Sequence, residues 1–134
     1  MKKRNKKQIA KRRKQFRYHK IDVIRKNGKK TKILHPTYIF LEKGNVYIYV
    51  SLTHSFAIKN RIVIKLNKNP NPIDYRDSYV VVDFKEDTKD RFGDRKQDWT
   101  IDDQNDFEIR EMYDLQMFEK NKKRWFCRSD FSDL

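Results

Sequence analysis

Apolar and polar positions alternate most regularly over residues 45–55, and this stretch is the clearest strand signal in the chain. Successive side chains of a β-strand point to opposite faces. The alternation therefore predicts two sets of side chains on opposite faces, Val46, Ile48 and Val50 on one and Tyr47, Tyr49 and Ser51 on the other. The strand ends on an imidazole flanked by two hydroxyls, in the sequence Thr53, His54, Ser55. A loop held by a rigid strand is a common place for binding and catalytic groups.

Turn signals divide the flanking sequence into further strands. Asn27-Gly28 separates two apolar-rich segments, and both residue types tolerate the positive φ of a tight turn, so residues 21–34 predict a β-hairpin. His35 precedes a proline and is therefore expected in extended chain, ahead of a strand over residues 37–41. The remaining predicted elements are a turn at residues 43–45, strands over 61–66 and 78–84, and a charged loop at 85–98.

A single helix is predicted near the C-terminal end, over residues 100 to about 120. Thr100 can cap its N-terminus, because Asp103 follows three residues later in a variant of the capping box. Carboxylates crowd the start of this segment and lysines its end, which suits the helix dipole. An aromatic tail follows at residues 125–134.

Short strands followed by one helix predict a mainly β (α+β) fold. The architecture we expect is a small antiparallel β-barrel of five or six strands with a C-terminal helix. A length of 134 residues suits one domain better than two, and we expect that domain at residues 21–134. Nine Phe, seven Tyr and two Trp can fill its core.

Positive charge is concentrated at the N-terminal end. The net charge is +14, and residues 1–20 hold eleven Lys or Arg and no acidic residue. Blocks of like charge repel and bury little, so residues 1–20 predict a disordered basic arm in which His19 is solvated. Such an arm suits a polyanion, with RNA favoured over DNA; a solubilising tail is the alternative. The candidate nucleic-acid contacts in the arm are Arg4, Arg12, Arg13 and Arg17.

Composition excludes several classes of protein. Cys127 is the only cysteine, so an internal disulfide and a cysteine-based zinc site are excluded, which suits the reducing cytoplasm. No apolar run reaches the roughly 20 residues that span a membrane, and the basic N-terminus lacks the apolar segment of a secretory signal. Helix capping explains the carboxylates of Asp102, Asp103 and Asp106, so we expect no metal and no other cofactor.

Hydroxyl, imidazole and basic groups near the central strand are candidates for phosphate chemistry. The hydroxyls of Thr53 and Ser55 can hold phosphate oxygens, and His54 or His35 can transfer a proton near neutral pH. Nearby positive charges can stabilise a pentacoordinate phosphate, and the candidates are Lys59, Arg61 and Lys65. Arg76 and Tyr79 are candidates for contact with RNA. Simpler interpretations stay open: hydroxyls that bond the local backbone, a solvated strand edge, and an Asp74–Arg76 pair that holds the segment 69–79.

From residue 35 to residue 66 the pattern resembles the PemK/MazF superfamily of toxin endoribonucleases, including its ToxN-like members. The shared features are a basic residue before proline, here His35 before Pro36, two apolar strands joined by a turn, a Thr-x-Ser element at Thr53 and Ser55, and a further apolar strand. The resemblance implies a compact barrel and a metal-independent endoribonuclease, with Thr53 and Ser55 as phosphate-binding hydroxyls. His35 stands where that family commonly has a catalytic arginine.

Three functions follow from these observations. The first is a toxin-like endoribonuclease of a toxin–antitoxin, phage or plasmid system, with an antitoxin protein or RNA and a second copy of the chain as further partners. The second is a non-catalytic nucleic-acid-binding accessory protein on a small barrel. The third is a barrel that binds another protein. An enzyme requires the two histidines and the two hydroxyls to meet in one pocket, whereas a binding module requires only a basic surface and exposed aromatic rings.

Overall fold

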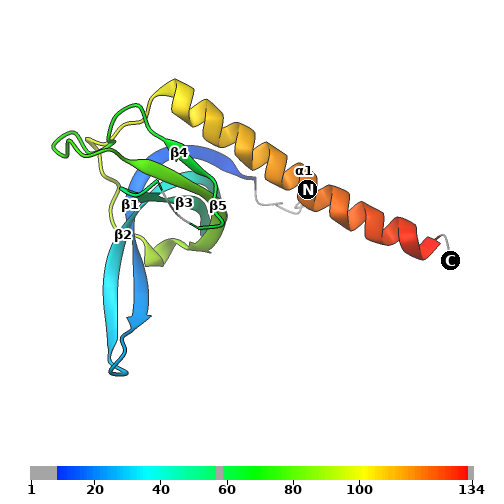
Figure 1. The fold of residues 1–134 in the computed structure, drawn as a ribbon, viewed down its shortest axis with the longest axis horizontal. Helices are drawn as coiled ribbons and strands as arrows, with labels where there is room; N and C mark the ends of the chain where they lie inside the picture. The colour runs from blue at the N-terminus through cyan, green and yellow to red at the C-terminus, as the bar shows by residue number, and fades with distance from the viewer. Residues whose placement is uncertain (1–8, 57–58, 133–134) are drawn as a thin grey trace, which may run out of the picture.

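The protein folds as one five-stranded antiparallel sheet with a long C-terminal helix, in a computed structural model that describes residues 9–56 and 59–132 (Figure 1). Side chains are described as far as residue 121. The elements are β1 (Lys11–Ile24), β2 (Lys30–Lys43), β3 (Val46–Thr53), β4 (Val63–Lys65), β5 (Tyr79–Thr88), the short 3₁₀ helix η1 (Lys89–Arg91) and α1 (Asp103–Ser132). The strand order is β1-β2-β3-β5-β4. The prediction of a mainly β fold with one C-terminal helix is confirmed.

The sheet curls but does not close, so the predicted barrel is not formed. Register shifts in the pairs β1–β2, β2–β3 and β3–β5 add curvature to the sheet. The outer edge of β1 is covered by the segment after η1, where the N–H groups of Gly93 and Lys96 donate to the carbonyls of Tyr18 (2.9 Å) and Phe16 (2.8 Å). β4 is only three residues long and forms the opposite edge. A strand this short offers too few backbone groups to join the two edges.

The predicted disordered arm is wrong from Lys11 onward, because residues 11–20 form most of β1. The strand pattern and carboxylates elsewhere in the chain explain this. Phe16 alternates into the core and is 1% exposed, while Arg12 and Arg13 pair with Asp106 and Glu42. The repulsion expected within a basic block is therefore offset by carboxylates that lie far away in the sequence. Residues 1–8 lie outside the described residues.

Both predicted turns on β2 are confirmed. Gly28 and Gly44 have φ angles of 84° and 58°, a left-handed conformation that glycine adopts without a steric penalty. The first turn is longer than a two-residue hairpin loop, since β1 ends at Ile24 and β2 begins at Lys30. Pro36 does not interrupt β2, so the two strands predicted around it are one strand of 14 residues. The predicted charged loop at residues 85–98 is shorter, because β5 continues to Thr88.

Two apolar clusters form on opposite faces of the sheet. The larger cluster includes Phe16, Tyr38, Phe40 and Val50, and Ile109 of α1 packs into it. The smaller cluster is aromatic, with Tyr47 and Tyr49 of β3 against Ile39 and Phe92. The alternation of β3 therefore separates two buried faces, which explains why both of its side-chain sets are apolar or aromatic.

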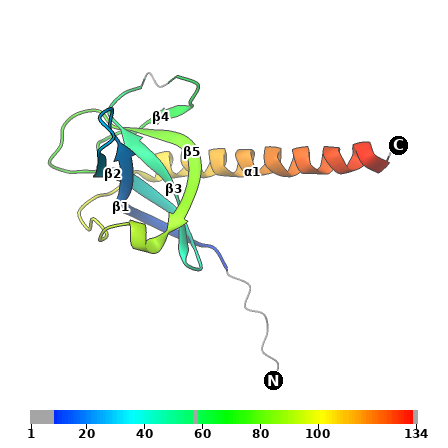
Figure 2. The same ribbon diagram turned by 90° about the horizontal axis from the view of Figure 1, so that it is seen from below.

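The helix begins later and ends later than predicted. α1 runs over 30 residues from Asp103, and the N–H of Asp106 donates to the carbonyl of Asp102 at 3.0 Å, so Thr100 is not the cap. The N–H of Thr100 instead bonds the carbonyl of Pro70 at 3.3 Å. The last turns of α1 extend away from the sheet (Figure 2), and the side chains of the predicted aromatic tail lie outside the described residues. In the described part of the chain, no helix is both long and apolar enough to span a membrane.

Candidate active site

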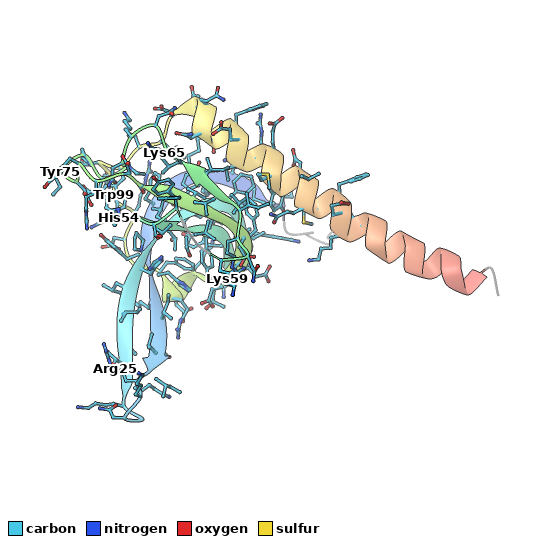
Figure 3. All side chains as sticks on the ribbon, in the orientation of Figure 1. Arg25, His54, Lys59, Lys65, Tyr75 and Trp99 are labelled. Carbon is cyan, nitrogen blue, oxygen red and sulfur yellow. The ribbon has the colours of Figure 1, made fainter. Side chains whose placement is uncertain are left out.

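A cavity of about 390 Å³ opens where β2, the end of β3 and the loop between β4 and β5 meet. It is lined by residues that are far apart in the sequence, including His35 of β2, Thr53 and His54 at the end of β3, and Arg76 of the loop. The other lining residues are Tyr18, Pro36, Leu52, Asn69, Asn71, Asp74, Ser78 and Trp99. Figure 3 shows His54, Trp99 and Tyr75 at the same end of the molecule.

His54 is held by a backbone carbonyl of the 69–77 loop. Its Nδ1 lies 2.8 Å from the carbonyl oxygen of Asp77, and a carbonyl can only accept, so Nδ1 carries the proton. The other ring nitrogen, Nε2, lies 3.7 Å from Oδ2 of Asp74. His54 therefore keeps Nε2 available for proton transfer, beside a carboxylate.

The loop over residues 69–77 is held by its own side chains. Two side-chain oxygens each accept a hydrogen bond from the backbone N–H of the residue two positions later. The Asn69 amide oxygen accepts from the N–H of Asn71 at 2.9 Å, and the Asp74 carboxylate accepts from the N–H of Arg76 at 3.1 Å. The guanidinium of Arg76 also donates to both carboxylate oxygens of Asp74, at 3.0 and 2.8 Å. These bonds to Arg76 lower the pKa of Asp74 and keep it negatively charged. The pair and the local turns expected from the sequence are both formed.

His35 is half-buried in the cavity wall. Burial lowers the pKa of His35 below its ordinary value of 6.5, because the charged imidazolium loses solvation there. A backbone hydrogen bond with Leu52 raises the pKa, and the nearby charges of His19 and Lys85 lower it further. The net shift is downward, so His35 is neutral near pH 7 and can accept a proton.

Thr53 and Ser55 have different positions. The Thr53 hydroxyl oxygen accepts the backbone N–H of Ser55 at 3.1 Å, so this hydroxyl does have the local backbone role considered above. Its own hydrogen stays available as a donor, and Thr53 lines the cavity. Ser55 is exposed, and the described residues that line the cavity do not include it. The expectation that two histidines and two hydroxyls meet in one pocket therefore holds for His35, Thr53 and His54 but not for Ser55.

Most of the basic residues singled out from the sequence contact other parts of the protein. Arg12 lies over the ring of Phe40 at 4.0 Å and bonds Asp106, and Arg17 donates to the carbonyl of Gly93 at 2.8 Å. Arg61 bonds Asp83 at 2.5 Å and lines a separate small pocket. The remaining positions are Arg13 beside Glu42, Lys65 at 3.7 Å from Asp77, and Lys59 on the surface, drawn apart from His54 in Figure 3. Arg4 lies outside the described residues.

Sequence reasoning missed two aromatic residues of the cavity wall. Tyr18 was assigned to a disordered arm and Trp99 borders the predicted charged loop, but their rings meet edge to face with centroids 5.8 Å apart. A further aromatic residue, Tyr75, is 97% exposed in the loop that carries Asp74 and Arg76. The aromatic character of Tyr18 and Trp99 was itself a sign that they pack against other residues. The high charge of the surrounding sequence favoured the prediction of a disordered arm and a loop instead.

The chain matches no family model, and comparisons with curated proteins and with solved structures found no match. In the described ranges, no group of three or more His, Cys, Asp or Glu side chains is arranged to hold a metal ion.

Proposed function

We propose that this protein is a metal-independent endoribonuclease that acts in the cavity between β2, β3 and the 69–77 loop. The observation that carries the proposal is that His35, Thr53, His54 and Arg76, from three separate segments, line one cavity. Two imidazoles, a hydroxyl and a guanidinium are sufficient for general acid–base cleavage of RNA. The resemblance to the PemK/MazF superfamily supports the same reaction and suggests a toxin of a phage or plasmid system, active in the cytoplasm and inhibited by an antitoxin.

The reaction is an internal transesterification of RNA. Neutral His35 takes the proton from a ribose 2′-hydroxyl, whose oxygen attacks the adjacent phosphorus. The bond from phosphorus to the 5′-oxygen breaks, and the protonated Nε2 of His54 gives its proton to that oxygen. The products are a 2′,3′-cyclic phosphate and a 5′-hydroxyl end. The Thr53 hydroxyl and Arg76 stabilise the extra negative charge on the pentacoordinate phosphate.

Exposed aromatic rings near the cavity suit a single-stranded substrate. Tyr75 is 97% exposed in the loop that carries Arg76, and Phe56 is 72% exposed one residue beyond Ser55. Unpaired bases stack on such rings, whereas bases in a duplex are already stacked on each other. Stacking on Tyr75 or Phe56 would hold nucleotides that flank the cleaved phosphate.

The test is RNA cleavage in the presence of a chelator. The purified chain should cut single-stranded RNA and leave cyclic-phosphate ends. His35→Ala and His54→Ala should each reduce the rate by roughly a hundredfold or more, the usual effect of losing a general acid or base. Thr53→Val, which removes only the hydroxyl, should reduce the rate by a similar factor. Ser55→Ala should have a smaller effect.

Thr88→Val is the matched control for Thr53→Val. Thr88 is the last residue of β5, at the end that pairs with Val46 and away from the cavity, and its hydroxyl bonds Asp90 at 2.5 Å. This variant should cleave RNA like the parent. If the parent cuts no RNA but binds it, and the cavity variants bind it equally well, the enzyme proposal is wrong. The alternative, a non-catalytic nucleic-acid-binding accessory protein, then stands.

A further inference from the structure

The end of the β1–β2 hairpin is a two-stranded ribbon that projects from the sheet (Figure 1). β1 and β2 stay paired as far as Ile24 and Lys30, whereas β3 pairs with β2 only between Thr37 and Lys43. Among the residues that the structure describes, no third strand therefore lies beside residues 20–34. Ile24 and Leu34 are 71% and 61% exposed, although a ribbon that served only the core would bury its apolar side chains.

The ribbon carries positive charges that no carboxylate neutralises. Residues 20–34 contain six basic residues and one acidic residue, Asp22, which lies 3.8 Å from Arg91 of η1. Within the described part of the chain, no carboxylate pairs with the five basic residues around the turn, Arg25, Lys26, Lys29, Lys30 and Lys32. By contrast, Arg12 and Arg13 of the same sheet pair with acidic side chains. Arg25 has one polar side-chain contact, to the Thr31 hydroxyl at 3.1 Å.

The ribbon leads directly to the cavity. Tyr18 of β1 and Pro36 of β2 face each other in the register and line the cavity together with His35. Lys30 is five residues from His35 on the same strand, a distance of roughly 17 Å at the rise of an extended strand. Figure 3 shows Arg25 at the far end of the ribbon from His54. A chain of phosphates lying along the ribbon would therefore enter the cavity at one end.

We propose that residues 20–34 form a nucleic-acid-binding ribbon that holds the RNA backbone on one side of the cleaved phosphate. This inference rests on the proposed function for its choice of RNA. Charge complementarity favours a polyanion, because the ribbon presents five unneutralised cations within eight residues around one turn. The exposed side chains of Ile24 and Leu34 contact riboses and bases between the phosphate contacts.

The experiment removes three lysines from the ribbon and three from elsewhere. The ribbon variant is Lys26→Gln, Lys29→Gln, Lys32→Gln. The control is Lys11→Gln, Lys43→Gln, Lys120→Gln, which removes the same net charge from exposed positions outside the ribbon. Affinity for a 2′-O-methyl RNA strand, which cannot be cleaved by its own 2′-oxygen, is measured by fluorescence anisotropy between about 50 and 200 mM salt. Cleavage of unmodified RNA is measured in parallel.

We expect the ribbon variant to lose affinity by roughly a hundredfold at about 0.1 M salt. Its plot of log affinity against log salt should become less steep by about 2, because each lost contact with a single strand contributes about 0.7. The control should change affinity less than about threefold, and both variants should melt like the parent. Equal behaviour of the two variants would overturn the inference, and the ribbon would then be free for a protein partner. A parent that binds through the ribbon but cuts nothing would refute the proposed function and leave this inference standing.

Discussion

His19 and His35 face each other in the β1–β2 register but have different environments. His19 is 7% exposed, with its Nε2 2.8 Å from Oδ2 of Asp87 and its ring stacked on Phe92 at 4.5 Å. The expectation that it is solvated was therefore wrong. His35 is half-buried and lines the cavity. His19 thus has a packing role and His35 a candidate chemical role. The difference comes from their surroundings, since both lie in the same pair of strands.

The lowered pKa of His35 predicts the pH dependence of cleavage. The proposed base must be neutral. Burial lowers the pKa of His35 below its ordinary value of 6.5, so the imidazole stays neutral when the pH falls to 6.5. The rate should therefore hold as pH falls through 6.5 and decline only at lower pH. The measurement is kcat/KM for RNA cleavage against pH, which reports the groups of the free enzyme. An acid-side decline with its midpoint above 6.5 would exclude His35 as the base.

Asp106 connects the helix to two strands of the sheet. Its Oδ1 accepts from Arg12 of β1 at 2.6 Å and from the Tyr38 hydroxyl of β2 at 2.5 Å, and its side chain is 8% exposed. Burial and the bond to Asp106 raise the pKa of Tyr38, so this phenol stays protonated and donates. Three elements thus depend on one carboxylate.

Asp106→Ala should therefore lower the free energy of unfolding by about 3 kcal/mol, because it leaves the partly buried Arg12 guanidinium and the buried Tyr38 hydroxyl without their acceptor. Asp103→Ala is the matched control on the same helix turn. The Asp103 side chain is fully exposed and lies 3.9 Å from Lys14, so its loss should lower the free energy of unfolding far less than the loss of Asp106. Urea unfolding of the two variants gives both values, and equal losses would contradict the role assigned to Asp106.

At the scale of elements, β1 has two separate functions. Its first half belongs to the core, where the Phe16 ring lies 4.9 Å from Tyr38 and 5.8 Å from Trp99. Beyond His19 its second half leaves the sheet and, among the described residues, pairs only with β2. One long basic strand therefore holds the fold together and also extends outward from the cavity.

Truncation tests whether folding requires β1 or the residues before it. A protein that lacks residues 1–8 should have the same far-UV circular dichroism spectrum and melting temperature as the parent, because the deletion removes none of β1. Deletion of residues 1–20 should abolish the cooperative melting transition, because it removes Phe16, Arg12 and most of the strand that pairs with β2. A folded protein lacking residues 1–20 would show that β1 is dispensable.

At the scale of the whole molecule, the charge asymmetry of the sequence has a role within the fold. The acidic second half supplies Asp106 to Arg12, Asp83 to Arg61 and Asp87 to His19. Much of the positive charge near the body of the sheet is therefore neutralised within the fold. Among the described residues, the largest group of neighbouring basic residues without acidic partners lies at the tip of the β1–β2 ribbon.

The sequence by itself determined the features that depend on neighbouring residues. The strand at residues 46–53 follows from a two-residue period, and the turns at Gly28 and Gly44 follow from the freedom of glycine at positive φ. The helix follows from the carboxylates of its first turn, which suit the helix dipole, and the bonds of Asp74 with Arg76 follow from short-range chemistry. Each of these signals lies within a few residues, so it can be read without knowing what lies beside it in space.

Only the tertiary structure decided which distant groups meet. Residues 11–20 look disordered as an isolated basic block, yet they form a strand because Asp106 and Glu42 lie beside them in the fold. The open sheet follows from the short β4 and from a β1 edge covered by the segment after η1, neither of which has a local signal. The cavity likewise depends on the pairing of β2 with β3 and on the return of the 69–77 loop. Contacts between residues 20 to 94 positions apart arise from the packing of whole elements, and no short pattern encodes them.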